Sequence, residues 1–283
     1  MTELDAAAAG LQTLVPEAAR LLKSLDALLE GWAIGDGADS MILPALLPVA
    51  DLANLDVHGT HPHRALVVCA VDLERRGRTS QRGRSEFQVE EMEAASVALP
   101  TAACFAVYLH FRDREIADRR LVTVLGRCFH HEGHADGVPR ILGFHMREVV
   151  ALGSPEYVAS HLRRYSVRIA ALAAALDLDM RTDVATDPFH DRNGQRAQYR
   201  QLSRATHEFL VGERRIASLD VQRNFFGERC GIRLAGTPDA VFTGCVAFRL
   251  ERWLAALAER YGDWLAAADA LSAVADRWTA VPV

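Results

Sequence analysis

The chain has 283 residues, of which 50% are hydrophobic and 24% charged, and its formal net charge is −5 at pH 7. This balance is typical of a globular protein with a substantial core, and the acidic excess argues against a general nucleic-acid binder. Five widely spaced cysteines, the lack of a secretory leader and the lack of an 18-residue apolar run predict a cytoplasmic protein with neither a disulfide framework nor a membrane span.

The first part of the chain contains one clear helix pattern and one clear strand pattern. Leucines recur at three- and four-residue steps over residues 16–32, which predicts an amphipathic helix. The apolar run ALVVCAVDL at residues 65–73 predicts a buried strand. Residues 74–86 then carry five arginines and no apolar residue, which predicts an exposed loop. The alternative for this loop is a docking patch for an acidic partner, formed by Arg75, Arg76, Arg82 and Arg84.

The middle of the chain predicts a long hairpin. Residues 121–129 and 141–152 have strand character, and EGHADGVP between them is typical of a turn. Because side chains alternate along a strand, Phe144, Met146 and Glu148 should share one face. A carboxylate among apolar neighbours is costly unless it has a partner. That partner is either a metal ion or one of the many arginines, and the spacing alone favours an arginine.

Four histidines surround this hairpin loop and invite a comparison with metal sites. His130 and His131 are adjacent, so they point to opposite faces of a strand, while His134 lies in the loop. One ion is not easily bound by such a set. The spacing therefore disfavours a histidine-based metal site.

The second half predicts helices and strands that alternate irregularly. Ser154, Pro155 and Glu156 combine an N-cap, a first-turn proline and an acid at the positive helix end, so a helix should run from there to about residue 176. Residues 213–227 and 240–248 predict strands, and residues 248–271 predict one more packed helix. The expected fold is α+β, an antiparallel sheet with helices packed on it, in a single domain over residues 1–283.

Four stretches, in order, resemble segments of one family. They are LPTAACFAVYLHF (99–111), the hairpin with RCFHHE (127–132) and RILGFHMRE (140–148), ATDPFHDRNG (185–194), and the run from residue 224 to residue 253. These stretches are similar to the amino acid:[carrier protein] ligases, which are class II aminoacyl-tRNA synthetase-like enzymes related to atypical zinc-dependent seryl-tRNA synthetases. The likeness extends from about residue 30 onward.

The resemblance implies a fold, a reaction and a metal. The fold would be a class II synthetase-like antiparallel sheet flanked by helices, in a homodimer without a tRNA-binding arm. The reaction would activate a small amino acid with ATP and pass it to the phosphopantetheine thiol of an acyl or peptidyl carrier protein, with no role for tRNA. The resemblance places a zinc ion on Cys104, Glu148 and Cys245. Three protein ligands would leave a fourth position for the amino group of the substrate.

The chain departs from the family pattern on the nucleotide side. His130 stands where an arginine normally binds the α-phosphate, His145 replaces a second arginine, and Arg249 replaces a glycine beside the adenine. By the resemblance, the candidate catalytic residues are His130, Glu132 and Arg252, and the candidate nucleotide-binding residues are Phe144, Arg140 and Arg249.

Two explanations of these departures stay open. In the first, Arg249 or Arg140 supplies the missing positive charge from a new direction, and the enzyme uses ATP and magnesium as a ligase. In the second, adenylation has been lost, and the protein acts on a preformed aminoacyl or acyl thioester of the carrier protein, by acyl transfer or another modification. A catalytically inactive regulatory relative is a variant of the second, but the retained zinc ligands argue against it.

Overall fold

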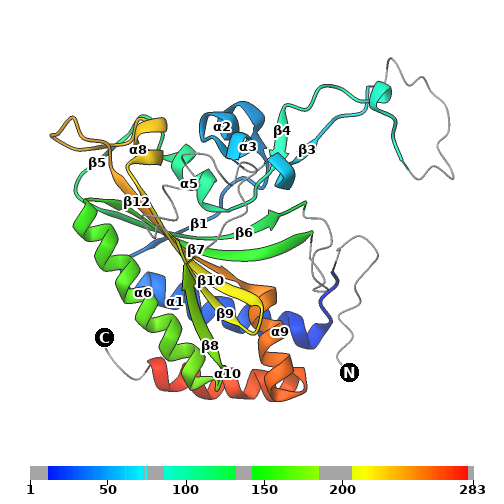
Figure 1. Cartoon of the computed structure of the whole chain (residues 1–283), viewed down its shortest axis with the longest axis vertical. Helices are drawn as coiled ribbons and strands as arrows, with labels where there is room; N and C mark the ends of the chain where they lie inside the picture. Colours follow the sequence, from blue (N-terminus) through cyan, green and yellow to red (C-terminus); the bar gives the residue numbers. More distant parts are fainter. Residues whose placement is uncertain are drawn as a thin grey trace.

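A seven-stranded sheet organises the molecule (Figure 1). The structure is a computed structural model and describes residues 12–60, 62–72, 74, 86–131, 142–184 and 206–279. The strands run in the order β1 (Asp39–Met41), β6 (Arg120–Phe129), β7 (Gly143–Gly153), β12 (Phe242–Arg249), β10 (Arg214–Arg223), β9 (Thr206–Val211) and β8 (Met180–Val184). Only β1 pairs in parallel, with β6, and the other neighbours are antiparallel. The predicted α+β fold is confirmed.

The predicted hairpin forms the centre of this sheet. Its two strands, β6 and β7, pair from Arg120 opposite Leu152 to Phe129 opposite Gly143. Residues 132–139, which were predicted as the turn, lie outside the described residues. Side chains of β7 alternate between two apolar clusters, with Phe144 and Met146 in one and Val149 in the other. This alternation is what the sequence pattern predicted.

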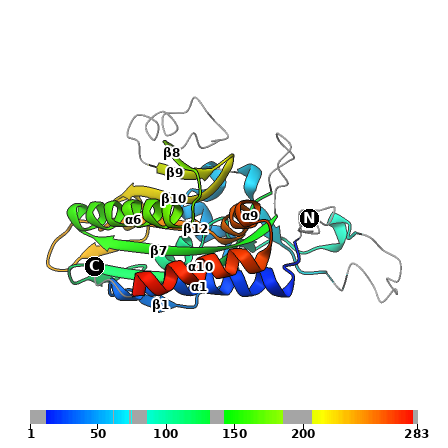
Figure 2. The ribbon, with the colours of Figure 1, turned by 90° about the horizontal axis from the view of Figure 1, so that it is seen from below.

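Four helices cover one face of the sheet. They are α1 (Pro16–Gly35), α6 (Pro155–Ala175), α9 (Leu250–Tyr261) and α10 (Trp264–Thr279). Figure 2 views the molecule from the side on which these helices lie. The predicted start of α6 is confirmed, because the Ser154 side chain accepts a hydrogen bond from the Tyr157 backbone N–H at 3.2 Å. We call this side of the sheet the α1 face.

The opposite side, which we call the α5 face, carries short elements. Its helices are α2 (Val49–Asn54), α3 (Val57–Thr60), α5 (Cys104–His110) and α8 (Phe225–Arg229), with 3-10 turns η1 (Pro62–Arg64) and η2 (Val89–Glu91). Two small sheets accompany them, namely β2 (Leu47–Pro48), β4 (Val97–Leu99) and β3 (Leu66–Val68), and β5 (Glu115–Ile116) with β11 (Arg233–Leu234). Each face therefore has its own apolar cluster.

Three local predictions were wrong. The expected buried strand at residues 65–73 is the three-residue β3, in which the Val67 side chain is 52% exposed. β-Branched residues favour a strand, but they do not determine whether another layer covers it. Residues 225–229 form α8 rather than the end of a strand. The single helix expected at residues 248–271 is two helices, because Gly262 adopts a positive φ of 84° and ends α9.

Two further predictions concern the arginine-rich loop and membrane-spanning helices. Of the arginine-rich loop at residues 74–86, only Glu74 and Glu86 are described, so the docking patch lies outside the described residues. Within the described residues, no helix combines the length and the apolar character that a membrane crossing requires.

Candidate metal centre

Three distant segments bring two thiols and a carboxylate together on the α5 face. Cys104 is the first residue of α5, Glu148 lies in the middle of β7, and Cys245 lies in the neighbouring strand β12. Their donor atoms all lie within 4.8 Å of one another. The three residues are 4%, 1% and 2% exposed, respectively. The set predicted from the family resemblance is thus assembled in one buried place.

The start of α5 orients the carboxylate. Glu148 Oε1 accepts a hydrogen bond from the Ala103 backbone N–H at 3.1 Å, and its Oε2 accepts one from the Cys104 N–H at 2.7 Å. The Cys245 thiol also donates to Oε2, at 3.2 Å. These contacts need α5 to lie very close to the sheet, and a Cβ on Gly126 would come within 2.6 Å of the Ala103 Cβ. A glycine at position 126 therefore permits the approach.

Burial controls the protonation of these groups. Burial raises the pKa of Glu148 and holds the pKa of the Cys245 thiol well above its usual value. The hydrogen bond with Cys245 lowers the pKa of Cys104, but burial and the nearby Glu148 carboxylate outweigh it and raise that pKa to about 11. Both thiols are therefore protonated at neutral pH in the absence of a cation, and a metal would displace their protons.

The chemistry of this donor set fits a zinc ion. Zinc prefers thiolate, imidazole and carboxylate ligands in a tetrahedron, and three protein ligands leave one position open. A carboxylate has about four lone-pair sites, so the two N–H bonds to Glu148 are compatible with metal ligation and would fix its orientation. Among the described residues, Glu148 forms no ion pair with an arginine.

A polar strip lies beside the three donors. Asp220 is directly opposite Cys245 in the sheet, and Thr206 Oγ1 donates to its carboxylate at 2.7 Å. The Tyr108 hydroxyl donates to Gln222 Oε1 at 2.5 Å. Sequence analysis missed these residues. The signal was present, because Asp220 and Gln222 are polar at alternate positions of a predicted strand and so share a face.

His130 contacts neighbouring protein groups. Its Nε2 lies 2.9 Å from the Thr101 carbonyl oxygen, and its ring stands edge-on to the Phe144 ring with the centroids 5.0 Å apart. An Nε2–H that donates to this carbonyl is not available to a phosphate at the same time. Phe144 is only 5% exposed, so protein atoms surround its ring.

His145 is held on the opposite side of the hairpin by a residue that sequence analysis did not single out. The buried Glu251 carboxylate accepts the His145 backbone N–H at 2.8 and 3.0 Å, and His145 Nδ1 lies 2.7 Å from Glu251 Oε1. The two residues are 106 positions apart, so no local pattern reveals the contact. The pair joins the start of β7 to the first turn of α9.

The remaining predicted residues fall into two groups. Arg252 Nη1 donates to the Arg215 carbonyl at 3.4 Å, and Arg249 Nη1 is buried with no hydrogen-bond partner in the described part of the chain. Glu132 and Arg140 lie outside the described residues.

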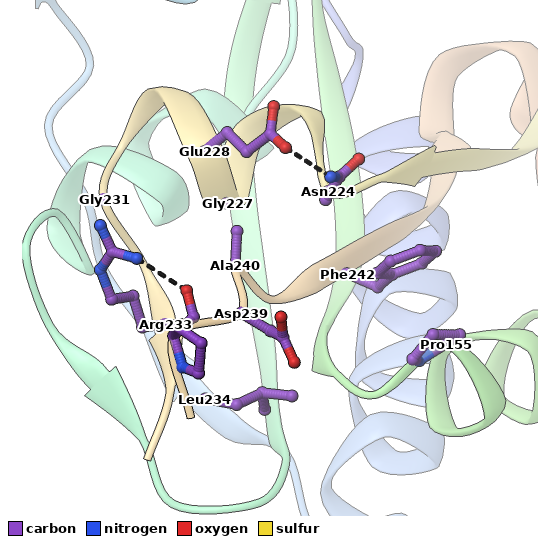
Figure 3. A pocket seen from close by; sticks show the side chains of 11 residues that line it. Pro155, Asn224, Gly227, Glu228, Gly231, Arg233, Leu234, Asp239, Ala240 and Phe242 are labelled. Carbon is purple, nitrogen blue, oxygen red and sulfur yellow. Dashed lines mark hydrogen bonds between the residues drawn. The ribbon is translucent and has the colours of Figure 1, made fainter. Parts of the chain in front are cut away.

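A separate cavity of about 490 Å³ lies at the far end of β12 (Figure 3). Its lining includes Asn224, Glu228 and Arg233. Glu228 accepts from Asn224 at 2.6 Å, and Arg233 donates to the Pro238 carbonyl at 2.8 Å, so each of these side chains already has a protein partner (Figure 3). None of the predicted site residues that the structure describes lines this cavity.

Two known proteins of one organism, both named as ligases, are similar to this chain. The chain is 30% identical over 247 residues to amino acid--[acyl-carrier-protein] ligase 1 of Bradyrhizobium diazoefficiens, covering 82% of this chain and 74% of that protein. It is 34% identical over 186 residues to ligase 2 of the same organism, covering 61% of this chain and 54% of that protein. No protein-family profile matches the chain.

A solved structure shows the same fold. The M. kandleri SerRS, in its complex with A. aeolicus tRNASec, superimposes with a TM-score of 0.72 at 20% identity. The match covers 90% of this chain and 54% of that one. The class II synthetase-like fold predicted from the sequence is therefore confirmed.

Proposed function

The chain belongs to the family of amino acid--[acyl-carrier-protein] ligases, and on that premise we propose that it activates a small amino acid with ATP and transfers it to the phosphopantetheine thiol of a carrier protein. The names of the two Bradyrhizobium relatives support the reaction class and the acceptor. We further propose a cytoplasmic homodimer with one zinc ion per chain, in which a carrier protein and not a tRNA accepts the amino acid.

The observation that carries this proposal is the convergence of Cys104, Glu148 and Cys245. Zinc held there would act as a Lewis acid with one open position for a free α-amine. The backbone N–H groups of Ala103 and Cys104 keep the Glu148 carboxylate in place. Such a site selects a substrate with an unprotonated amino group and excludes N-acylated compounds.

Other residues of the α5 face would position the amino acid and the nucleotide. The carboxylate of Asp220 and the Tyr108–Gln222 pair lie where they can contact a small polar substrate beside the three donors. Arg252 and Glu132 are proposed to act on the reacting groups, and Phe144 and Arg140 to contribute to nucleotide binding. We assign His130 a positioning role, because its ring joins the end of β6 to Thr101, three residues before Cys104.

The second candidate function is modification of a preformed aminoacyl or acyl thioester of the carrier protein without adenylation. The contact between His130 and the Thr101 carbonyl favours it, because the residue that replaces the phosphate-binding arginine is already engaged. The presence of the metal donors is common to both candidates, so metal content alone does not separate them.

Amino-acid-dependent exchange of pyrophosphate into ATP separates the two functions. With a panel of small amino acids, we expect exchange with at least one of them, followed by its transfer to a phosphopantetheinylated carrier protein but not to tRNA. Absence of exchange, together with conversion of a preformed thioester, would establish the second function instead.

Metal analysis tests the centre itself. We expect about one zinc per chain in the purified protein, and its loss together with loss of exchange in Cys104→Ala and Cys245→Ala. Cys230→Ala is the matched control, because Cys230 is also a buried free cysteine but lies at the end of α8, outside the donor set. Full zinc retention in both site variants would contradict the assignment.

A further inference from the structure

Arg249 occupies a junction between the sheet and a helix. It is the last residue of β12 and the N-cap of α9. It lies directly opposite Met146 in the sheet, and Ala247 and Cys245 precede it at alternate positions of the same strand. Because alternate residues share a face, the Arg249 side chain lies on the α5 face with the metal donors. Its positive charge is close enough to the buried Cys128 thiol to lower the pKa of that thiol, although burial has the larger, opposite effect.

The guanidinium of Arg249 is incompletely satisfied. Its Nη1 is buried and has no hydrogen-bond partner among the described residues. Buried polar groups in native proteins are almost always paired, and an exception calls for a ligand or another specific explanation. A guanidinium has only donors, so the missing group is an acceptor. Its charge makes an anion the best acceptor.

The surroundings of Arg249 favour an anion as well. No side chain caps the N-terminus of α9, so the partial positive charge of its first turn adds to that of Arg249. The nearest carboxylate in the sequence, Glu251, is engaged by the backbone N–H and the ring of His145. The Cys128 thiol is neutral, because burial holds its pKa well above its usual value.

The distance to the metal donors limits the size of the ligand. Arg249 and Cys245 are four residues apart on one strand, so their Cα atoms are separated by about 13 Å at about 3.3 Å per residue. A substrate with its amine at the donors and an anionic group at Arg249 is therefore a small extended molecule. An aminoacyl nucleotide and an aminoacyl phosphopantetheine arm each carry a free amine and a phosphate ester joined by one chain.

We infer that Arg249 binds the phosphate ester of a substrate or co-substrate, and that it supplies the charge which the family places at the position of His130. The inference rests on the proposed function only for the source of that phosphate, which is a nucleotide in the ligase reaction and the phosphopantetheine arm in the second function. Arg249 is thus a binding residue at a position where the family has a glycine.

Paired ligands that differ only by the phosphate test this role. Calorimetric titrations compare AMP with adenosine, and 4′-phosphopantetheine with pantetheine, on the zinc-loaded protein. In Arg249→Met we expect at least a tenfold loss of affinity for one phosphorylated ligand, with no loss for its unphosphorylated counterpart. Arg249→Lys should fall between the two, because it keeps the charge and loses the planar fork.

The controls separate this inference from the proposed function. Arg127→Met removes an exposed arginine from β6 and should leave all four affinities unchanged. A phosphate-specific loss for AMP supports the inference with nucleotide as the source, and a loss for 4′-phosphopantetheine alone supports it while removing adenylation. Equal affinities of Arg249→Met and the unmodified protein for both phosphorylated ligands would overturn the inference, whereas pyrophosphate exchange decides the proposed function independently.

Discussion

Two arginines at the centre of the sheet, Arg147 in β7 and Arg249 in β12, have opposite surroundings. Arg147 is 3% exposed on the α1 face and forms a bidentate pair with Asp26 of α1, with both distances 2.7 Å. Its Nη1 also donates to Thr123 Oγ1 at 3.3 Å. Arg249, one register position away on the α5 face, has a buried Nη1 without a partner among the described residues.

The two faces of the sheet thus differ in the partners that they provide for a buried arginine. On the α1 face, a long helix supplies carboxylates that satisfy the buried cation, so the charge contributes to the fold. On the α5 face, the start of the short helix α5 supplies two N–H groups to Glu148, but the described residues supply no acceptor to Arg249 Nη1. The role of a buried arginine therefore depends on the hydrogen-bond acceptors around it, and the residue type alone does not reveal that role.

The largest effect on stability should follow from breaking the pair on the α1 face. Arg147→Met leaves the Asp26 carboxylate without its partner, and we expect a loss of about 3–5 kcal/mol in the free energy of unfolding. Urea unfolding measures it. Arg20→Met, which removes an exposed pair with Glu17, should leave the free energy of unfolding nearly unchanged.

The comparison predicts a different response for the second arginine. Arg249→Met removes an incompletely satisfied charge, so the unfolding free energy should stay equal or rise. Equal losses in Arg147→Met and Arg249→Met would show that the two faces do not differ in the way described.

A pH effect of about 3 kcal/mol should also arise on the α1 face. Burial lowers the pKa of His161, which is 2% exposed, from 6.5 to about 4. Between these values the unfolded chain binds more protons than the folded one, so stability falls as pH decreases from 6.5 towards 4. The whole effect corresponds to about 3 kcal/mol at about 1.4 kcal/mol per pKa unit.

A non-titrating variant isolates this contribution. Unfolding curves of His161→Gln and the unmodified protein, measured from pH 7.5 to 4.5, should differ in slope, with the steeper loss in the unmodified protein. His131→Gln serves as the control, because His131 is exposed and should leave the slope unchanged. Parallel curves for His161→Gln and the unmodified protein would contradict the prediction.

A smaller loss of stability than in Arg147→Met, about 1–3 kcal/mol, is expected for a glycine variant on the α5 face. The new methyl group of Gly126→Ala would meet the Ala103 Cβ at 2.6 Å, so α5 must move away from the sheet. The N–H groups that hold Glu148 would move with it, and we expect zinc affinity to fall about 10- to 100-fold. Competition with a chromogenic chelator measures this affinity.

A compensating variant tests whether the clash between residues 126 and 103 causes the loss of zinc affinity. The double variant Gly126→Ala with Ala103→Gly removes the clash and should recover most of the lost affinity. Failure of the double variant to improve on Gly126→Ala would mean that the distance between α5 and the sheet does not control the centre.

The sequence predicted features that depend on local patterns. The alternation around Glu148 correctly placed the carboxylate on an apolar face, and the Ser154 cap correctly started α6, because both follow from backbone geometry. The convergence of Cys104 with Glu148 and Cys245 came from the family resemblance, since no spacing rule joins three segments so far apart.

Features that depend on tertiary contacts were not predictable. The apolar spacing continues through Gly262, so the end of α9 was missed although glycine is a common helix terminator. The engagement of Glu251 with His145 and the unpaired Nη1 of Arg249 depend on which elements pack together. The periodicity of a single sequence does not reveal such contacts.

The junction between β12 and α9 also connects the two faces of the sheet. Arg249 extends towards the α5 face, while Glu251, two residues later, binds His145 on the other side of β7. A ligand bound by Arg249 therefore acts on the residue that begins α9, two residues before the carboxylate that holds the imidazole. The ring resonances of His145 thus provide an intrinsic spectroscopic reporter, on the far side of the sheet, of occupancy at a site that the imidazole does not touch.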